Sequence, residues 1–404
     1  MTETAAKDAP PLHGIRVLDL TTFLSGPFCT QVLADLGAEV VKVEPPAGDS
    51  SRHIPPHFVG EDSAYFLANN RTKRSVCVDM RQDEGQALVR RLVGESDVVV
   101  ENFRPGVPAR LGLDIDRLRA AHPGLIWASI TGFGLDGPWA KRPAYDMIVQ
   151  ALSGVMSLTG EPGRPSVRLG IPAGDTVAGL YAAVAINAAL AERARTGTGR
   201  HVDVGMLDCQ LAMLSYQSAY ALIGGATPGP QGAQHDSIPT YRAFTAGDGR
   251  QIAVTANTEK MWAGLASALG RGDLLEDPRF ADARLRLANK AALWAELEPA
   301  FMARDAADWA ERLTEHDVPN ALVKTVPEAL EDARGSGREM VVSMADEDGQ
   351  AIEVVGSPIR MGPGVPVPAT YPPDLGGDAT EVLSDWLGMG AGEVETLQAA
   401  GVLK

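Results

Sequence analysis

The chain has 404 residues, of which 45% are hydrophobic and 22% are charged, and its formal net charge at neutral pH is -16. This length predicts two or three domains, and the composition is typical of a globular protein. The acidic balance argues against nucleic acid and anionic membranes as partners, so an anionic ligand needs a local concentration of basic side chains.

The cysteines and the terminal segment give expectations about compartment. Cys29, Cys77 and Cys209 lie far apart in the sequence, which indicates neither a disulfide framework nor a thiolate zinc site. The first residues, "MTETAAKDAPPLHG", lack the apolar segment of a secretory signal, and the longest apolar stretch, "VAGLYAAVAINAALA", is short for a membrane span. We therefore expect a cytoplasmic protein without a membrane partner and without a metal site.

Strand and helix patterns alternate through the first third of the chain. Strands are expected over residues 15–20, 38–44, 75–80, 97–103 and 125–131, with helices opening at Pro27 and spanning 84–95. This alternation predicts an α/β fold with a parallel, doubly wound sheet. Ligands of such sheets bind beyond the carboxyl ends of the strands, and here those ends lead into loops rich in Gly, Pro and small polar residues.

One of these loops carries Gly132, Gly134 and Gly137 with the GxGxxG spacing of a dinucleotide-binding site. That motif needs a helix to open at the last glycine, but Pro138 follows and the next residues have no helical periodicity. The sequence therefore favours a loop that is rich in glycine for steric reasons.

The rest of the chain predicts a long buried helix that begins at Thr176, with Gly197 and Gly199 beyond its end, and later a break in the pattern. The segment 224–235 is rich in Gly and Pro and is expected to be a linker or a mobile loop. A hairpin centred on "GDG" and several helices follow it. We expect residues 1–225 to form the first part of a large domain, 226–330 a smaller α+β domain, and 331–404 a return to the large domain.

Asp175 is the first candidate for chemistry. It directly precedes the long helix, where an aspartate is a favoured N-cap, and it follows Pro172 and Gly174 in a tight turn. A carboxylate held rigidly in such a turn is also suited to act as a nucleophile. Two basic clusters near strand ends, Arg71 with Lys73 and Arg74, and Arg104 with Arg110, are either solvated surface charges or partners for phosphate groups.

Six segments together resemble the family III CoA-transferases, which include formyl-CoA transferase and the α-methylacyl-CoA racemases. The segments are "LHGIRVLDLTTFLSGPFCTQVLADLGAEVVKVEPP", "NNRTKRSVCVDM", "DVVVENFRPGVPARLGL", "SITGFGLDGPWAKRPAYD", "GIPAGDTVAGLYAA" and "RTGTGRHVDVGMLD". The resemblance implies an interlocked homodimer, each chain with a large Rossmann-like domain and a smaller one, that acts on an acyl-CoA and a small carboxylic acid.

The resemblance also implies functional residues. It makes Asp175 the nucleophile that forms a mixed anhydride and then an aspartyl-CoA thioester, and the dipole of the helix that follows is expected to favour its ionised form. Coenzyme A is the implied substrate. Its contacts are implied at these positions: Leu24, Ser25, Val78, Asp79, Met80, Arg81, Asn102, Phe103, Arg104, Arg110, Arg142, Pro143, Ala144 and Tyr145.

Two departures from the family pattern reduce the number of reactions and donors that the resemblance allows. Tyr145 stands where racemases carry a histidine base, and a tyrosine is a poor base near neutral pH, so a transferase is favoured. Leu24 stands where formyl-CoA transferase has a glutamine, and the glycine run of that enzyme is reduced to "GPQGAQH" here. We expect a longer donor, such as succinyl-CoA. A racemase and a CoA-binding protein without turnover remain alternatives.

Overall fold

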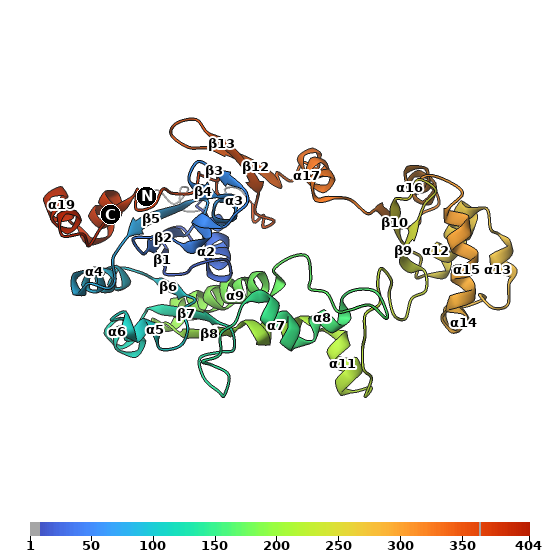
Figure 1. Ribbon diagram of the computed structural model, residues 1–404, viewed down its shortest axis with the longest axis horizontal. Coiled ribbons are helices and arrows are strands. Elements are labelled where there is room, and N and C mark those ends of the chain that lie inside the picture. Colours follow the sequence, from blue (N-terminus) through green and yellow to red (C-terminus); the bar gives the residue numbers. More distant parts are fainter. Residues whose placement is uncertain (1–8, 363–364) are drawn as a thin grey trace. The chain divides into compact units, whose positions relative to one another are not determined.

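The computed structural model describes residues 9–362 and 365–404, and the chain divides into two compact units (Figure 1). Unit 1 contains the described residues up to 156 together with 168–226 and 333–404, and unit 2 contains 157–167 and 227–332. Residues 1–8, on which part of the leader-segment expectation depends, lie outside the described residues.

Unit 1 is built on a six-stranded sheet in which every neighbouring pair is parallel. The strands, in their order across the sheet, are β5 (Lys73–Cys77), β2 (Glu39–Glu44), β1 (Arg16–Asp19), β6 (Val98–Glu101), β7 (Ile126–Thr131) and β8 (His201–Gly205). The chain passes from β1 outward to β2 and β5, then returns beside β1 with β6 and continues to the other edge. The sheet therefore has a switch point between β1 and β6, where ligands of open α/β sheets bind.

The helices of unit 1 and the two ribbons beside its sheet have the following bounds. They are α2 (Ser25–Asp35), η1 (Ser50–His53), β3 (Phe58–Val59), β4 (Asp62–Ser63), α3 (Ala64–Leu67), α4 (Asp83–Gly94), α5 (Val107–Arg110), α6 (Ile115–Ala121), α7 (Asp146–Ser153), α9 (Ala173–Thr196), α10 (Met206–Met213), α11 (Tyr216–Leu222), β12 (Val341–Ala345), β13 (Ala351–Val355), α18 (Ala379–Leu387) and α19 (Ala391–Ala399). Two further helices, α8 (Val155–Leu158) and α17 (Val326–Gly335), contain the boundaries between the units.

The two faces of the sheet carry separate apolar cores, because successive strand residues point to opposite sides. Val17 packs with residues of α2, α9 and α10 on one face, and Leu18 packs with residues of α4, α18 and α19 on the other. Helices therefore cover both faces, which confirms the predicted α/β class with a parallel, doubly wound sheet.

Unit 2 is a small α+β body with its own core. A three-stranded antiparallel sheet, β11 (Asn320–Leu322), β10 (Gln251–Thr255) and β9 (Tyr241–Thr245), packs with α12 (Glu259–Leu269), α13 (Asp273–Glu276), α14 (Ala283–Ala288), α15 (Lys290–Phe301) and α16 (Ala306–Glu315). β9 and β10 form the hairpin predicted around "GDG". Phe244 and Phe301 stack at 4.2 Å between ring centroids in the centre of this core.

The long helix α9 begins three residues earlier than predicted and is not buried all round. It contacts α2, α10 and β7, but Leu180, Tyr181 and Val184 remain exposed on its other face within the single chain. By length and apolar composition alone α9 is also long enough to cross a membrane, which the sequence analysis did not anticipate. Its packing on the sheet is that of a core helix.

The first basic cluster has a structural role rather than the phosphate-binding role considered for it. Arg71 is buried and its Nη2 donates to both carboxylate oxygens of Asp35, and Lys73 is buried with its Nζ 3.0 Å from Asp19 Oδ2. Arg74 pairs with Glu39 and with another acidic side chain at the surface. These cations are engaged inside unit 1 because strand β5 and the turn before it place them against acidic residues of β1, β2 and α2.

Candidate active site

Asp175 lies in the first turn of α9, and the prediction that it is the N-cap is wrong. The N-cap residue is Pro172, and α9 begins at Ala173. The capping acceptor comes from α7 instead, because Asp146 Oδ1 accepts a hydrogen bond of 2.7 Å from the backbone N–H of Gly174. The carboxylate of Asp175 is therefore not committed to capping its own helix.

Gly174 is required for this approach of α7 to α9. A Cβ at this position would lie 2.7 Å from Val149 Cγ2 and 2.9 Å from Asp146 Oδ1, both inside van der Waals contact. Asp146 is itself held by Gln150, whose Nε2 donates to Asp146 Oδ2 over 2.7 Å. The backbone next to Asp175 is thus fixed by close packing and by a partly buried hydrogen bond.

The environment of Asp175 favours its neutral form. Burial and, after it, the nearby charge of Asp146 raise the pKa of Asp175 from its ordinary value to about 7. This shift is opposite in direction to the effect expected from the helix dipole, and its causes are burial and a like charge. Tyr65 lies within electrostatic reach: burial and the charges of Asp175, Asp146 and Asp49 raise its pKa to about 12.

A cavity of about 540 Å³ opens at the carboxyl ends of β1, β2, β5 and β6, and we call it the switch-point cavity. Its walls are mainly apolar, and Asp79 and Arg81 form an ion pair of 2.8 Å at its edge. Five of the predicted CoA contacts line it: Val78, Asp79, Met80, Arg81 and Phe103. The cavity thus gathers residues from two segments that the sequence analysis identified separately.

Three further predicted contacts meet beside this cavity, at the switch point itself. The side chain of Asn102, which follows β6, bonds both backbone groups of Thr22 at 2.9 and 2.8 Å. The same side chain lies 3.3 Å from Ser25 Oγ. Ser25 and the preceding Leu24 are buried at the start of α2.

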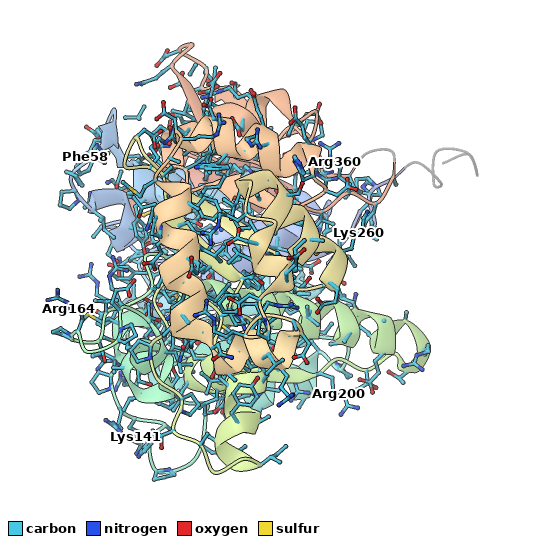
Figure 2. All side chains as sticks on the ribbon, turned by 90° about the vertical axis from the view of Figure 1, so that its right-hand side faces the viewer. Phe58, Lys141, Arg164, Arg200, Lys260 and Arg360 are labelled. Atoms are coloured by element: carbon cyan, nitrogen blue, oxygen red, sulfur yellow. The ribbon has the colours of Figure 1, made fainter. Side chains whose placement is uncertain are left out.

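The remaining predicted contacts lie outside the switch-point cavity, Arg110 at the end of α5 and the others in loops, and all of them except the half-buried Ala144 are exposed. Arg104 lines a shallow hollow of about 350 Å³ together with Phe103, whereas Arg110 lines none of the cavities described here. Arg142 lies over the rings of Phe133 and Trp139, and its neighbour Lys141 projects from the same loop to solvent (Figure 2).

The end of that loop leads to α7. Tyr145, which ends it, is 63% exposed; Pro143 is also exposed, and Ala144 is half-buried. The glycine-rich loop before them begins no helix, since the next helix is α7 at Asp146. A Cβ on Gly132 would lie 2.2 Å from Ala144 Cβ, so this glycine serves close packing, which confirms the steric interpretation.

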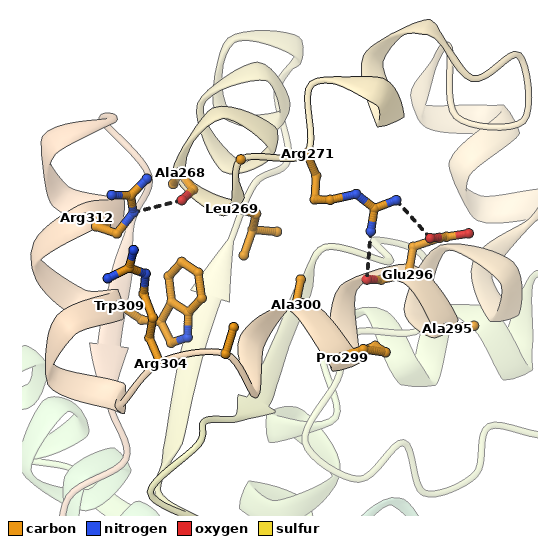
Figure 3. A pocket seen from close by; sticks show the side chains of 12 residues that line it. Ala268, Leu269, Arg271, Ala295, Glu296, Pro299, Ala300, Arg304, Trp309 and Arg312 are labelled. Carbon is orange, nitrogen blue, oxygen red and sulfur yellow. Dashed lines mark hydrogen bonds and ion pairs between the residues drawn. The ribbon is translucent and has the colours of Figure 1, made fainter.

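Unit 2 has cavities of its own that contain none of the predicted site residues. Figure 3 shows one of about 520 Å³, in which Arg271 is engaged by Glu296, and Arg312 Nε donates to the carbonyl of Ala268. Within residues 9–362 and 365–404, no group of three His, Cys, Asp or Glu side chains is placed to hold a metal ion.

The structure adds three polar residues that the sequence analysis did not select. Asp146 and Tyr65 lie within electrostatic reach of Asp175, and Asp49 lies in the loop after β2 and accepts a hydrogen bond from Thr22 in the loop after β1. Asp146 directly follows residues 142–145, which the resemblance implies for CoA binding, but the resemblance did not extend to Asp146 itself. Nothing in the local pattern around Tyr65 marks it as close to Asp175.

Comparisons with known proteins bear on this arrangement. The sequence model of CoA-transferase family III matches residues 12–379. A succinate–glutarate CoA-transferase of Agrobacterium fabrum is 39% identical over 93% of this chain and 96% of its own length, and a succinyl-CoA:glutarate CoA-transferase of Mus musculus is 35% identical over 98% and 90%. A CAIB/BAIF family protein from Brucella suis superposes with a TM-score of 0.84 at 38% identity, covering 94% of this chain and all of the other.

Proposed function

The chain belongs to CoA-transferase family III and is an acyl-CoA:carboxylate CoA-transferase, and we propose that Asp175 is the nucleophile through which it transfers CoA. The observation that carries this proposal is the position of Asp175 in the first turn of α9. There its side chain is half-buried, and Asp146 of α7 supplies the cap that Asp175 would otherwise provide.

The proposed reaction exchanges activated acyl groups without loss of thioester energy. A carboxylate oxygen of Asp175 attacks the donor thioester carbon, the C–S bond breaks, and CoA thiolate leaves behind an acyl-aspartyl anhydride. The thiolate then attacks the aspartyl carbonyl, which releases the donor acid and leaves an aspartyl-CoA thioester. The acceptor carboxylate repeats these two steps in reverse and regenerates the free Asp175 carboxylate.

The switch-point cavity is the proposed CoA site. Its apolar walls suit the flat faces of a purine. Arg81 lines this cavity, the exposed Arg104 lines the hollow that shares Phe103 with it, and both side chains are suited to phosphate oxygens. Leu24, Ser25, Asn102, Arg110 and the segment 142–145 are proposed to complete this site, as the family resemblance implies.

The proposed donor and acceptor are dicarboxylic, since the two relatives described above are named for succinate or succinyl-CoA and for glutarate. We further propose that the chain forms the interlocked homodimer of the family. The exposed apolar face of α9 at Leu180, Tyr181 and Val184 supports a second chain as its cover. A cytoplasmic location is proposed from the three free, buried cysteines.

Trapping of the activated aspartate tests the proposal. The protein is incubated with succinyl-CoA, quenched with hydroxylamine and digested with trypsin, and the peptide of residues 169–193 is sequenced by mass spectrometry. This peptide contains two acidic residues, Asp175 and Glu192, so fragmentation assigns the hydroxamate. A hydroxamate on Asp175 is expected. Solvent exchange of the α-proton without any hydroxamate would favour a racemase, and CoA binding without either signal would favour a binder.

The reaction is expected to depend on pH through Asp175. Because burial and Asp146 raise its pKa to about 7, Asp175 is protonated below this pH, and kcat/KM for the donor is expected to rise with pH and level off above about 7. Asp146→Asn removes the like charge, so the midpoint of this rise is expected to move to lower pH. Initial rates from pH 5 to 9 measure it.

Asp136→Asn, at an exposed position, is the matched control for that series and is expected to keep the wild-type midpoint. If the midpoint does not move in Asp146→Asn, the charge of Asp146 is not a cause of the raised pKa of Asp175.

The raised pKa of Asp175 also affects the stability of the protein. Since the pKa of Asp175 is higher in the folded than in the unfolded chain, its contribution to the free energy of unfolding is complete at low pH and is lost as pH rises through about 7.

Arg104→Ala is expected to raise the Kd for CoA about tenfold, as the loss of one charge-assisted phosphate contact should. The change in Kd is expected to shrink at high salt, because an exposed contact is screened. Titration calorimetry with CoA measures both. Arg200→Ala, which removes an exposed arginine paired with Glu192 (Figure 2), is the control and is expected to leave Kd unchanged. An unchanged Kd in Arg104→Ala would remove Arg104 from the site.

A further inference from the structure

The loop between β1 and α2 has a conformation that needs outside support. We call residues 20–24 the switch loop, since it leaves β1 at the switch point of the sheet. Phe23 in this loop has φ of 66°, a left-handed conformation that side-chain-bearing residues rarely adopt. Such a residue persists only where surrounding contacts determine it, and residues of this kind cluster at active sites, ligand clamps and switch regions.

Asp49 supplies one set of these contacts. Its Oδ1 accepts hydrogen bonds from Thr22 Oγ1 at 2.8 Å and from the backbone N–H of Phe23 at 3.2 Å. Its Oδ2 lies 2.9 Å from Nζ of Lys42, and both side chains of this ion pair are buried. Burial alone would raise the pKa of Asp49, but Lys42 and the hydrogen bonds it accepts hold that pKa well below its usual range.

Lys42, which pairs with Asp49, also bonds the backbone of the switch loop. Its Nζ donates to the carbonyl of Thr21 over 2.7 Å, and its side chain is fully buried within β2. A buried ammonium group is costly unless it is paired, so Lys42 fixes Asp49 and Thr21 relative to each other. From the opposite side, Asn102 bonds both backbone groups of Thr22. The switch loop is therefore clamped between the loops that follow β2 and β6.

The clamped segments are also two walls of the switch-point cavity. Thr21 and Thr22 line it from the switch loop, and residues 45–50, including Asp49, line it from the loop after β2. Phe23 also contacts Tyr145, with ring centroids 6.1 Å apart, and Tyr145 directly precedes Asp146 and α7. The conformation of the switch loop thus affects both the cavity and the segment that caps the helix of Asp175.

We infer that Asp49, held by Lys42, is a positioning residue for CoA binding: it fixes the switch loop through Thr22 and Phe23 so that the loop forms one wall of the CoA site. This inference rests on the proposed assignment of the switch-point cavity to CoA. It assigns no contact between Asp49 and the reacting atoms.

Thr22→Val tests the inference, because valine matches threonine in shape but cannot donate to Asp49. Two quantities are measured: the Kd for CoA alone by titration calorimetry, and backbone hydrogen exchange of peptides containing residues 20–25 in the free protein. Both a rise of about tenfold in Kd and faster exchange without ligand are expected. Asp49→Asn is expected to show the same pair of changes, and Thr22→Ser, which keeps the hydroxyl, is expected to restore both.

Thr396→Val is the control, since it removes an exposed hydroxyl that bonds the carbonyl of Gly392 in α19. Wild-type exchange in Thr22→Val would overturn the inference even if Kd rises, because Thr22 would then act on CoA directly. An unchanged Kd would overturn it as well. CoA alone is the probe, so this test is independent of the proposed nucleophile. A protein that binds CoA but forms no hydroxamate on Asp175 would refute the role of Asp175, and the Kd and hydrogen exchange of Thr22→Val would still decide the role of Asp49.

Discussion

Replacing Asp175 with asparagine is expected to lower the rate of CoA transfer by on the order of 10³-fold or more, because the reaction then has no nucleophile to form either acyl-enzyme species. The side chain keeps its size, so CoA binding in the switch-point cavity is expected to remain near the wild-type level. Transfer from succinyl-CoA to glutarate, followed by chromatography of the two thioesters, measures the rate, and calorimetry with CoA measures binding.

The same variant is expected to be at least as stable as the wild type at pH 8. Ionised Asp175 is disfavoured by burial and by Asp146, so a neutral amide relieves a cost that the native site retains for catalysis. Asp175→Ala serves as a second variant that cannot regain a carboxylate by deamidation. Asp136→Asn is the control and is expected to be fully active. Transfer at the wild-type rate in Asp175→Ala would remove Asp175 from the mechanism.

The sheet of unit 1 could be predicted from the sequence because its strands are short apolar runs separated by helices. Val17, Val40 and Val98, and the residues next to them, pack on both faces, so buried parallel strands read as continuous apolar segments. Glycines and prolines at the strand ends marked the loops that now surround the switch-point cavity. Periodicity and turn chemistry were sufficient for this level of structure.

The site could be predicted only in part, because its electrostatics depend on contacts between distant segments. Asp175 was identified, but the residue that caps its helix, Asp146, is 29 positions away from it and accepts a hydrogen bond from the backbone N–H of Gly174. Lys73 was taken for a possible phosphate ligand, since a sequence shows the charge of a lysine and not the carboxylate that it meets across the sheet. Propensity at the start of α9 favoured Asp175 as its own cap, and tertiary contact with α7 overrode that preference.

Lys73→Met is expected to lower the free energy of unfolding by about 3 to 5 kcal/mol, since it removes one member of a buried ion pair and leaves the buried carboxylate of Asp19 without its directly paired cation. Burial alone would raise the pKa of Asp19, but the charges of Lys73 and Lys42 and hydrogen bonds from Thr21 and Thr30 hold it at about 2. Asp19 therefore stays ionised at neutral pH and would remain charged in the variant. Urea unfolding at pH 7, followed by circular dichroism, measures the loss.

Two comparisons separate the buried pair from a general effect of removing a cation. Arg117→Met breaks the exposed pair with Asp114, whose Nε–Oδ2 distance is 3.2 Å, and is expected to cost no more than about 1 kcal/mol. The double variant Lys73→Met with Asp19→Asn is expected to be more stable than Lys73→Met alone, because the buried charge that lost its directly paired cation is then removed as well. Equal losses in the two single arginine and lysine variants would show that burial of this pair does not govern the stability of unit 1. The pair joins β1 and β5, and Lys73 Nζ also donates to the carbonyl of Pro27 in α2, so its loss should loosen the strand that leads into the switch loop.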